Sequence, residues 1–152
     1  MLRTSFWAIV ISCSFVSLSS AGVTHITSIA NETNGLVEFR NFENPDKRGH
    51  NASVPRGKTV GIEQVDAWIP WADSQQDLDD GKYLRFKFKK TQKDGSTSER
   101  TIYVWQSKGS IRCSEALVHS PDTPAVPGVG QEDGRRKVVF KSDGTFEFFK
   151  TE

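Results

Sequence analysis

Short runs in which hydrophobic and polar residues alternate recur along most of the chain. In the segment 83–89, the apolar residues Leu84, Phe86 and Phe88 alternate with basic residues. Alternation with a period of two puts one set of side chains on each face of a β-strand, so that one face is buried and the other meets water. No stretch of a dozen residues shows the apolar spacing of an amphipathic helix. The pattern therefore predicts strands.

Turn-forming residues separate these runs. Asp143-Gly144 and Asn34-Gly35 each lie between two predicted strands, and such dipeptides are the strongest short-range signal for a hairpin. The predicted strands comprise residues 24–29, 36–41, 59–68, 83–89, 101–106, 110–113, 137–141 and 145–149. About eight short strands at close spacing predict one all-β domain, either an antiparallel β-sandwich or a closed barrel.

Two segments interrupt this rhythm. The segment 69–82 combines a proline with several acidic residues, and the segment 119–134 contains Pro121, Pro124 and Pro127. The second segment is longer than most structural connections, and irregular loops of this kind often carry functional residues. We therefore expect 119–134 to form an irregular surface loop.

Residues 1–21 have the three parts of a signal peptide. Arg3 supplies the positive charge, residues 6–18 are uncharged, and Ser19 and Ala21 are the small residues that a signal peptidase accepts. The uncharged run is shorter than the roughly 20 apolar residues that a membrane-spanning helix needs. We predict cleavage after Ala21 and secretion of the remaining chain. The alternative is an N-terminal core helix or membrane anchor.

The predicted mature chain, residues 22–152, carries no formal net charge. Removal of Arg3 lowers the number of lysine and arginine residues from 20 to 19, which equals the 19 acidic residues. A nucleic-acid-binding surface needs a basic excess that neutralises phosphates, so this class of partner is not expected. Cys113 is the single cysteine of this segment, which excludes an intramolecular disulfide. We expect its thiol to be buried as a small apolar group.

Two N-glycosylation sequons begin at Asn31 and Asn51, and neither has proline in its middle position. In a eukaryotic secretory pathway both asparagines would be candidate glycan acceptors, which normally lie on surface loops. We therefore predict a glycoprotein with acceptors at these two positions. The sequons agree with the predicted export and say nothing about activity.

The segment 66–73 holds the most distinctive combination of residues. An Ile-Pro step separates Trp68 from Trp71, and Asp73 follows. An exposed indole offers an apolar face on which a sugar ring can stack, while carboxylates accept hydrogen bonds from its hydroxyl groups. These three residues are therefore predicted to form a carbohydrate-binding platform. The alternatives are that the indoles fill the core or anchor the chain at a bilayer interface.

Asp77 and Trp105 extend the predicted binding site. Tyr103 and Trp105 alternate with Ile102 and Val104, so these two pairs face opposite sides of a strand. One side must face the core, and the alternation alone does not decide which. Trp105 is therefore either an outward aromatic that supports the platform or a buried residue.

An acidic run follows the tryptophans, and it consists of Asp73, Asp77, Asp79 and Asp80. Calcium prefers several carboxylate oxygens within one loop, but this run lacks the glycine position and the closing glutamate of an EF-hand. The three histidines lie far apart in sequence, without the close ligand spacing of a zinc site. We predict no metal site and no cofactor, with calcium as the alternative.

No catalytic motif stands out. Cys113 and His119 supply the residue types of a nucleophile and its base, and paired carboxylates would serve glycoside hydrolysis. No spacing in the sequence singles out either arrangement. The interpretation favoured by these patterns is a secreted, non-catalytic, lectin-like module that binds carbohydrate or a glycoconjugate. The alternative is a membrane-active or lipid-binding protein of the toxin or lysin type, and the third hypothesis is a small secreted hydrolase.

Overall fold

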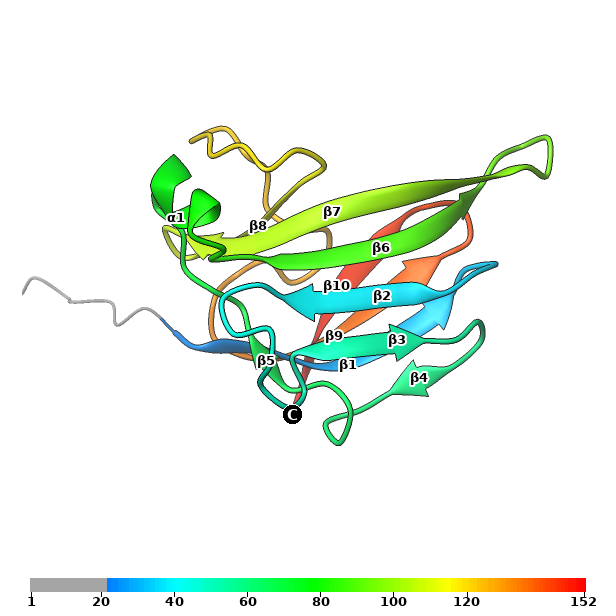
Figure 1. Ribbon diagram of the computed structural model, residues 1–152, viewed down its shortest axis with the longest axis horizontal. Helices are drawn as coiled ribbons and strands as arrows, with labels where there is room; N and C mark the ends of the chain where they lie inside the picture. The colour runs from blue at the N-terminus through cyan, green and yellow to red at the C-terminus, as the bar shows by residue number, and fades with distance from the viewer. Residues whose placement is uncertain (1–21) are drawn as a thin grey trace, which may run out of the picture.

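The structure is a computed structural model that describes residues 22–152; the predicted signal peptide lies outside the described residues (Figure 1). The elements are β1 (Thr24–Glu32), β2 (Val37–Asn41), β3 (Asn51–Val54), β4 (Thr59–Val60), β5 (Ala67–Trp68), α1 (Gln75–Asp79), β6 (Leu84–Thr91), β7 (Thr97–Ser107), β8 (Ser110–Ser114), β9 (Gly134–Lys141) and β10 (Phe146–Thr151). One short helix beside ten strands confirms the all-β prediction.

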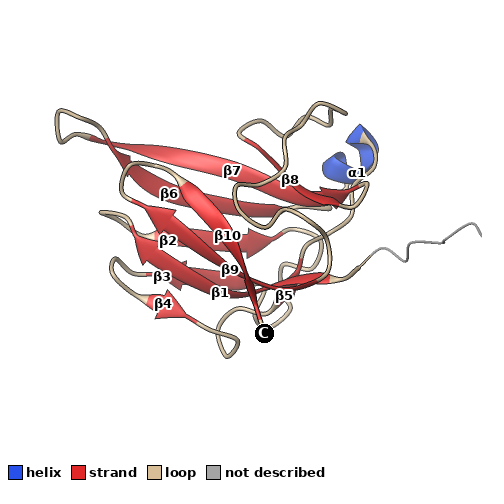
Figure 2. Cartoon of the chain, turned by 180° about the vertical axis from the view of Figure 1, so that it is seen from behind, coloured by secondary structure: helices blue, strands red, loops and turns tan. Residues whose placement is uncertain are grey.

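The strands form two sheets that lie as two layers (Figures 1 and 2). Sheet A has the order β10-β9-β1-β4, and β5 pairs with β1 beside this path; sheet B has the order β3-β2-β6-β7-β8. Neither sheet closes on itself, so the closed-barrel alternative is wrong. Both sheets contribute to one hydrophobic core, in which the ring of Phe140 from β9 lies 5.1 Å from that of Phe86 and 4.7 Å from that of Phe88 on β6.

The pairing of β1 with β9 is parallel, which contradicts the prediction of purely antiparallel sheets. Thr24 lies opposite Gly134, and the register continues to Glu32 opposite Lys141. Two consecutive antiparallel strands can be recognised from the short turn that joins them. A parallel pair this distant in sequence has no such turn, so the local sequence does not reveal it. The parallel pair lies at the centre of sheet A.

The hairpin predicted at Asn34-Gly35 is also wrong, because β1 and β2 belong to different sheets. The Asn31 side chain donates to the carbonyl oxygens of Gly35 and Val54, at 2.7 Å each, and so fixes the crossing. The predicted strand 59–68 is divided into β4 and β5 by a turn. The Asp143-Gly144 hairpin between β9 and β10 is confirmed.

The proline-rich segment 119–134 joins the two sheets along one side. The Val126 amide donates to the Ile111 carbonyl of β8 at 2.9 Å, and the Val129 amide donates to the Phe148 carbonyl of β10 at 2.8 Å. A Cβ on Gly128 would collide with the Phe148 carbonyl oxygen, so this close approach requires glycine. The loop therefore covers two strand edges that would otherwise expose unpaired backbone groups.

The buried guanidinium group of Arg136 holds this loop in place. Its nitrogens donate to four carbonyl oxygens, those of Val129, Gln131, Asp133 and Arg135, at 2.6–3.2 Å. The side chain is 1% exposed. Burial lowers the pKa of the guanidinium from its usual value, yet these carbonyl groups replace the hydrogen bonds that water would supply.

We predict that Arg136→Met lowers the free energy of unfolding by about 2 to 4 kcal/mol, because buried carbonyl groups lose their charged donor. The matched control is Arg135→Met on the exposed neighbouring residue, which should change stability by less than about 0.5 kcal/mol. Urea denaturation followed by circular dichroism measures both. Equal losses in the two variants would contradict a specific role for the Arg136 guanidinium.

Candidate functional site

Trp68, the first residue of the predicted platform, is half-buried at the end of β5. Its Nε1 donates to Oε2 of Glu43 at 2.8 Å, and Nζ of Lys47 lies 4.0 Å from the ring centroid. The ring of His50 contacts it edge-on, with centroids 4.6 Å apart. These contacts fix Trp68 beneath the loop 42–50 and occupy part of the surface that a sugar would need.

Trp105 is completely buried, which is one of the two positions that the alternation of residues 102–105 left open. The segment around Trp71 pairs with the edge of β7 in a parallel bridge, where the Ala72 amide donates to the Gln106 carbonyl at 3.0 Å. Ala72 and Leu78 then pack on the Trp105 indole. Both faces of β7 are therefore covered at Trp105. The alternating pattern predicts only one buried face, so it could not indicate this arrangement.

Trp71 itself is half-buried. Its indole Nε1 is buried and has no hydrogen-bond partner among the residues that the structure describes. The backbone on either side of it is fixed to β7, since the Gln106 amide also donates to the Pro70 carbonyl, at 2.7 Å. Trp71 is thus tied into the end of sheet B and does not project from it as a free platform.

Asp73 and Asp77 belong to the start of α1. Oδ2 of Asp77 accepts from the Asp73 amide and from the Ser74 hydroxyl, both at 3.0 Å, while Oδ1 accepts from Nζ of Lys82 at 2.6 Å. The bond from Lys82, followed by those from Asp73 and Ser74, lowers the pKa of Asp77 to about 2. Asp73 in turn accepts from the Ser107 hydroxyl at 2.9 Å. These carboxylates are engaged in capping the helix and holding it to β7.

Across residues 22–152, no group of three or more histidine, cysteine, aspartate or glutamate side chains is arranged to hold a metal ion. The carboxylates of Asp79 and Asp80 accept hydrogen bonds from Gln75 and Gln76 on the same helix, each at 2.9 Å. The acidic run is thus spread around one helical turn and does not converge on a point.

The two sequons differ sharply in accessibility. Asn31 is 1% exposed; its amide nitrogen donates to two carbonyl groups, and its oxygen accepts from the Thr33 amide and hydroxyl at 2.9 and 2.7 Å. A glycan on this nitrogen is incompatible with the fold. Asn51 is exposed on β3, an edge strand of sheet B, where its amide donates to the Pro45 carbonyl.

We expect protein secreted from a eukaryotic host to carry an N-glycan at Asn51 and none at Asn31. Glycopeptide mass spectrometry of the secreted protein measures both occupancies, and Asn51→Gln should remove the glycan mass completely. A folded, secreted protein with a glycan on Asn31 would contradict the buried setting of that residue.

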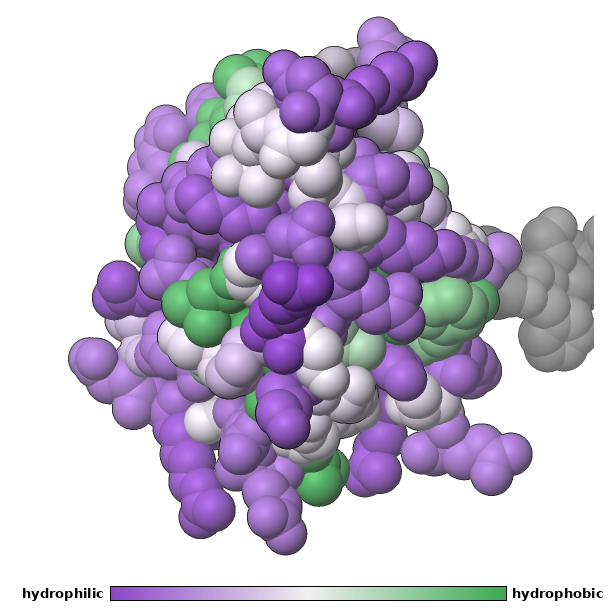
Figure 3. Space-filling view, turned by 90° about the vertical axis from the view of Figure 1, so that its right-hand side faces the viewer, coloured by the Kyte–Doolittle hydropathy of each residue, from purple (hydrophilic) through white to green (hydrophobic). Residues whose placement is uncertain are grey.

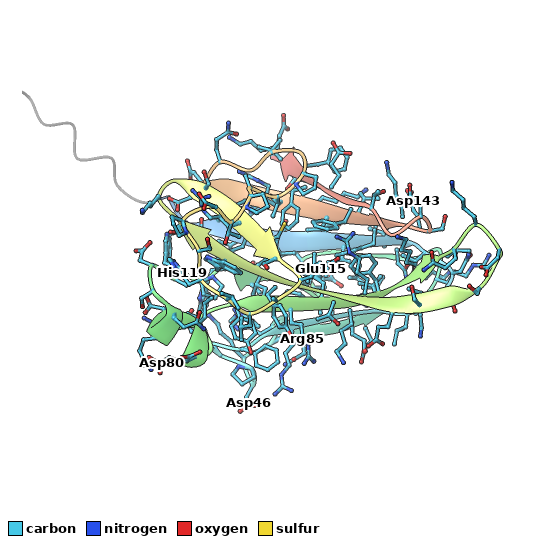
Figure 4. All side chains as sticks on the ribbon, turned by 90° about the horizontal axis from the view of Figure 1, so that it is seen from above. Asp46, Asp80, Arg85, Glu115, His119 and Asp143 are labelled. Atoms are coloured by element: carbon cyan, nitrogen blue, oxygen red, sulfur yellow. The ribbon has the colours of Figure 1, made fainter. Side chains whose placement is uncertain are left out.

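A hollow of about 340 Å³ lies on the outer face of sheet B, over β3, β2 and β6. Its polar lining consists of Glu38, Arg40, Asn51, Ser53 and Arg85, with Phe39 and Ala52 below them. Figure 4 shows Arg85 on the side of sheet B that faces away from sheet A. These side chains come from regular strands, which hold them in fixed positions.

The strand register explains why these residues meet. Asn51 lies opposite Arg40, Arg40 lies opposite Arg85, and Arg85 lies opposite Tyr103. One row across four strands thus places two arginines side by side at its centre. The sequence showed Arg85 on a wet strand face but not its partner, because β2 and β6 are not consecutive strands.

An aromatic stack fixes the position of both arginines. The Cζ atoms of Arg40 and Arg85 lie 5.0 and 4.9 Å from the ring centroid of Phe42, which stacks on Tyr83 with centroids 4.8 Å apart. A cation over an aromatic face is attracted by the electron density of the ring. Phe42 therefore holds two like charges close together beside the hollow.

The loop 42–50, which presents Phe42, ends at a buried histidine. Nδ1 of His50 donates to the Asn44 carbonyl at 2.8 Å, while Nε2 is buried without a partner among the described residues. Burial lowers the pKa of His50 below 6.5, and the charge of nearby Lys47 adds to this effect. Protonation would place an unpaired N–H donor in this buried position.

We therefore predict that acidification destabilises the protein through His50. Because its folded pKa is lowered, the unfolded chain binds the proton first, so the free energy of unfolding falls as pH drops below the ordinary histidine pKa of 6.5. His50→Asn preserves a donor toward Asn44 and should weaken this dependence between pH 7.5 and 5, whereas His119→Gln should leave it intact. An unchanged pH profile in His50→Asn, measured by urea denaturation, would contradict the prediction.

Comparison with protein-family models, curated proteins and solved structures found no match. The function therefore has to be inferred from the geometry of the hollow and its surroundings.

Proposed function

We propose that residues 22–152 form a secreted, non-catalytic binding module of the β-sandwich type, which binds carbohydrate on the outer face of sheet B. The observation that carries the proposal is the hollow over β3, β2 and β6, where five of the seven lining residues present hydrogen-bonding side chains fixed on strands. Secretion follows from the predicted signal peptide. The binding face proposed from the fold replaces the tryptophan platform proposed from the sequence.

The chemistry of the lining favours a hydroxyl-rich ligand. Arg40, Asn51 and Arg85 supply donors, Glu38 supplies acceptors, and the Ser53 hydroxyl supplies both. Sites for apolar small molecules are lined mainly by hydrophobic and aromatic side chains, which this hollow does not present. A sugar, with several hydroxyl groups and a shallow shape, fits a polar hollow of this kind.

Two features support binding without catalysis. Glycoside hydrolysis uses a pair of carboxyl groups, and Glu38 is the one carboxylate among the residues lining the hollow. Cys113, the alternative nucleophile, lies half-buried against the core. Burial raises the pKa of its thiol to about 11, so little of the reactive thiolate forms near neutral pH.

The membrane-active alternative receives less support. Within the described chain every tryptophan is half-buried or buried, so none stands out as an interfacial anchor. Among the described residues, the exposed large hydrophobic residues are Phe149 on β10 and four residues outside the strands and the helix, Val23, Leu36, Ile62 and Val118. The face shown in Figure 3 is mainly hydrophilic, with separate small hydrophobic groups. No helix in residues 22–152 has the length and apolar character needed to cross a bilayer.

The test is to fill the hollow and measure glycan binding. Ser53→Tyr places a ring among the lining residues, and the matched control, Ser98→Tyr, places the same ring on an exposed position of β7. Protein from a host that adds no N-glycans is titrated by calorimetry with a panel of neutral and acidic oligosaccharides. We expect Ser53→Tyr to weaken binding by about tenfold or more, since several hydrogen bonds are lost, and Ser98→Tyr to bind like the wild type.

Other outcomes would contradict the proposal in different ways. Loss of binding in Trp71→Ala, together with full binding in Ser53→Tyr, would show that the carbohydrate binds at the tryptophans and not in the hollow. New reducing ends after incubation with the oligosaccharides would show a hydrolase. Binding to liposomes without binding to any glycan would favour the membrane-active alternative.

A further inference from the structure

We propose that the carbohydrate is acidic, and that Arg40 and Arg85 together bind its carboxylate or sulfate group. This inference rests on the binding site proposed above and specifies the chemical class of its ligand. The observation behind it is a pair of arginines that lie directly opposite each other, beside a row in which Lys87 lies opposite Glu38.

In the neighbouring rows of sheet B, lysine side chains lie opposite glutamate side chains, so their charges compensate each other. Lys87 lies opposite Glu38 in the register, and its Nζ is 3.8 Å from Oε1 of Glu99. Lys89 lies opposite Glu99. Opposite charges placed across strands in this way stabilise a sheet.

Arg40 and Arg85 break this rule. They lie directly opposite each other, and no salt bridge or side-chain hydrogen bond joins either guanidinium group to another of residues 22–152. Like charges directly opposite one another destabilise a sheet. Glu38, the one carboxylate among the lining residues, lies opposite Lys87 in the next row. The pair therefore leaves a positive site that a bound anion would neutralise.

The two guanidinium groups are preorganised for binding an anion. Phe42 holds both guanidinium groups against one ring, at 5.0 and 4.9 Å, so little side-chain freedom remains to be lost on binding. Each guanidinium group carries a planar set of N–H donors that matches two oxygens of a carboxylate or sulfate. Asn51, opposite Arg40, adds a neutral amide for the adjoining hydroxyl groups of the sugar.

Asn51 has a second consequence for this site. It is the accessible sequon, and it lines the same hollow as the two arginines. A glycan on Asn51 would start beside the anion site and compete with the ligand for space. The experiment therefore uses protein from a host that adds no N-glycans.

Three polymers separate the ligand classes: polygalacturonate carries carboxylates, dextran sulfate carries sulfates, and dextran is neutral. Biolayer interferometry with each immobilised polymer gives the affinity of the wild type. We expect at least one acidic polymer to bind about tenfold or more tightly than dextran, with the stronger of the two identifying the group. Raising the salt from about 0.1 M to about 1 M shortens the Debye length from about 10 Å to about 3 Å and should weaken this binding.

Variants locate the binding on the arginine pair. Arg40→Gln and Arg85→Gln should each reduce affinity for the acidic polymer by about tenfold, since each removes a charge-assisted donor set. Lys87→Gln on the same face and Arg135→Gln on sheet A remove the same charge elsewhere and should each change affinity less than about twofold. The melting temperatures of Arg40→Gln and Arg85→Gln should not fall, because a like-charge pair is removed.

The outcomes distinguish this inference from the proposed function. Equal binding to dextran and both acidic polymers, blocked by Ser53→Tyr, would overturn the acidic ligand and keep a carbohydrate site. Equal losses in all four charge variants would overturn the arginine pair as the anion site and indicate non-specific attraction. Absence of binding to all three polymers, together with a negative oligosaccharide panel, would overturn both proposals.

Discussion

The guanidinium group of Arg136 is the contact on which the joining of the two sheets depends. It lies at the start of β9 and donates to four carbonyl groups, three of which belong to the loop 119–134. That loop in turn bonds to β8 of sheet B and to β10 of sheet A. The described chain has one free cysteine, Cys113, and therefore no disulfide to perform this task. A buried polar side chain, with a hydrogen bond from each guanidinium nitrogen, links the loop to β9 in place of a covalent bond.

The position of this loop also decides which surface remains free. It covers the edges of β8 and β10, while the segment around α1 covers the outer face of β7 above Trp105. The outer face of sheet B over β3, β2 and β6 contains the hollow, with Phe42 of the loop 42–50 beside it. There the two arginines face each other at a cost to the sheet, offset in part by the ring of Phe42. A ligand-binding role would explain why two arginines lie opposite each other at an exposed surface, because a bound anion would neutralise them.

The sequence predicted the features that depend on local pattern. Alternation in 83–89 identified β6 and its buried face, and Asp143-Gly144 identified the hairpin of β9 and β10. It failed where distant segments meet. The parallel pairing of β1 with β9 is not preceded by a short turn that the sequence could reveal. Asn34-Gly35 has the sequence of a hairpin turn, but the hydrogen bonds of Asn31 direct the chain into the other sheet.

The proposed site differs from the one predicted from the sequence for the same physical reason. Residue type drew attention to the tryptophans, but Trp105 is buried by a helix whose short length gave no periodic signal. The arginine pair arises from the register of β2 against β6, which is set by core packing and not by any local motif. Phe42 and Arg40 could be seen in the sequence as part of a mixed aromatic and charged segment. Their position beside Arg85 depends on the pairing of β2 with β6.

The most direct test of the acidic-ligand site is a titration of isotope-labelled protein with a short oligogalacturonate or sulfated oligosaccharide, followed by nuclear magnetic resonance. We expect the Nε–H signals of Arg40 and Arg85 and the backbone amides of β2, β3 and β6 to shift together and to saturate at one ligand concentration. Signals of β9 and β10 on the other sheet should stay in place. Saturable shifts confined to Trp68 and Trp71, with both arginine signals unmoved, would contradict it.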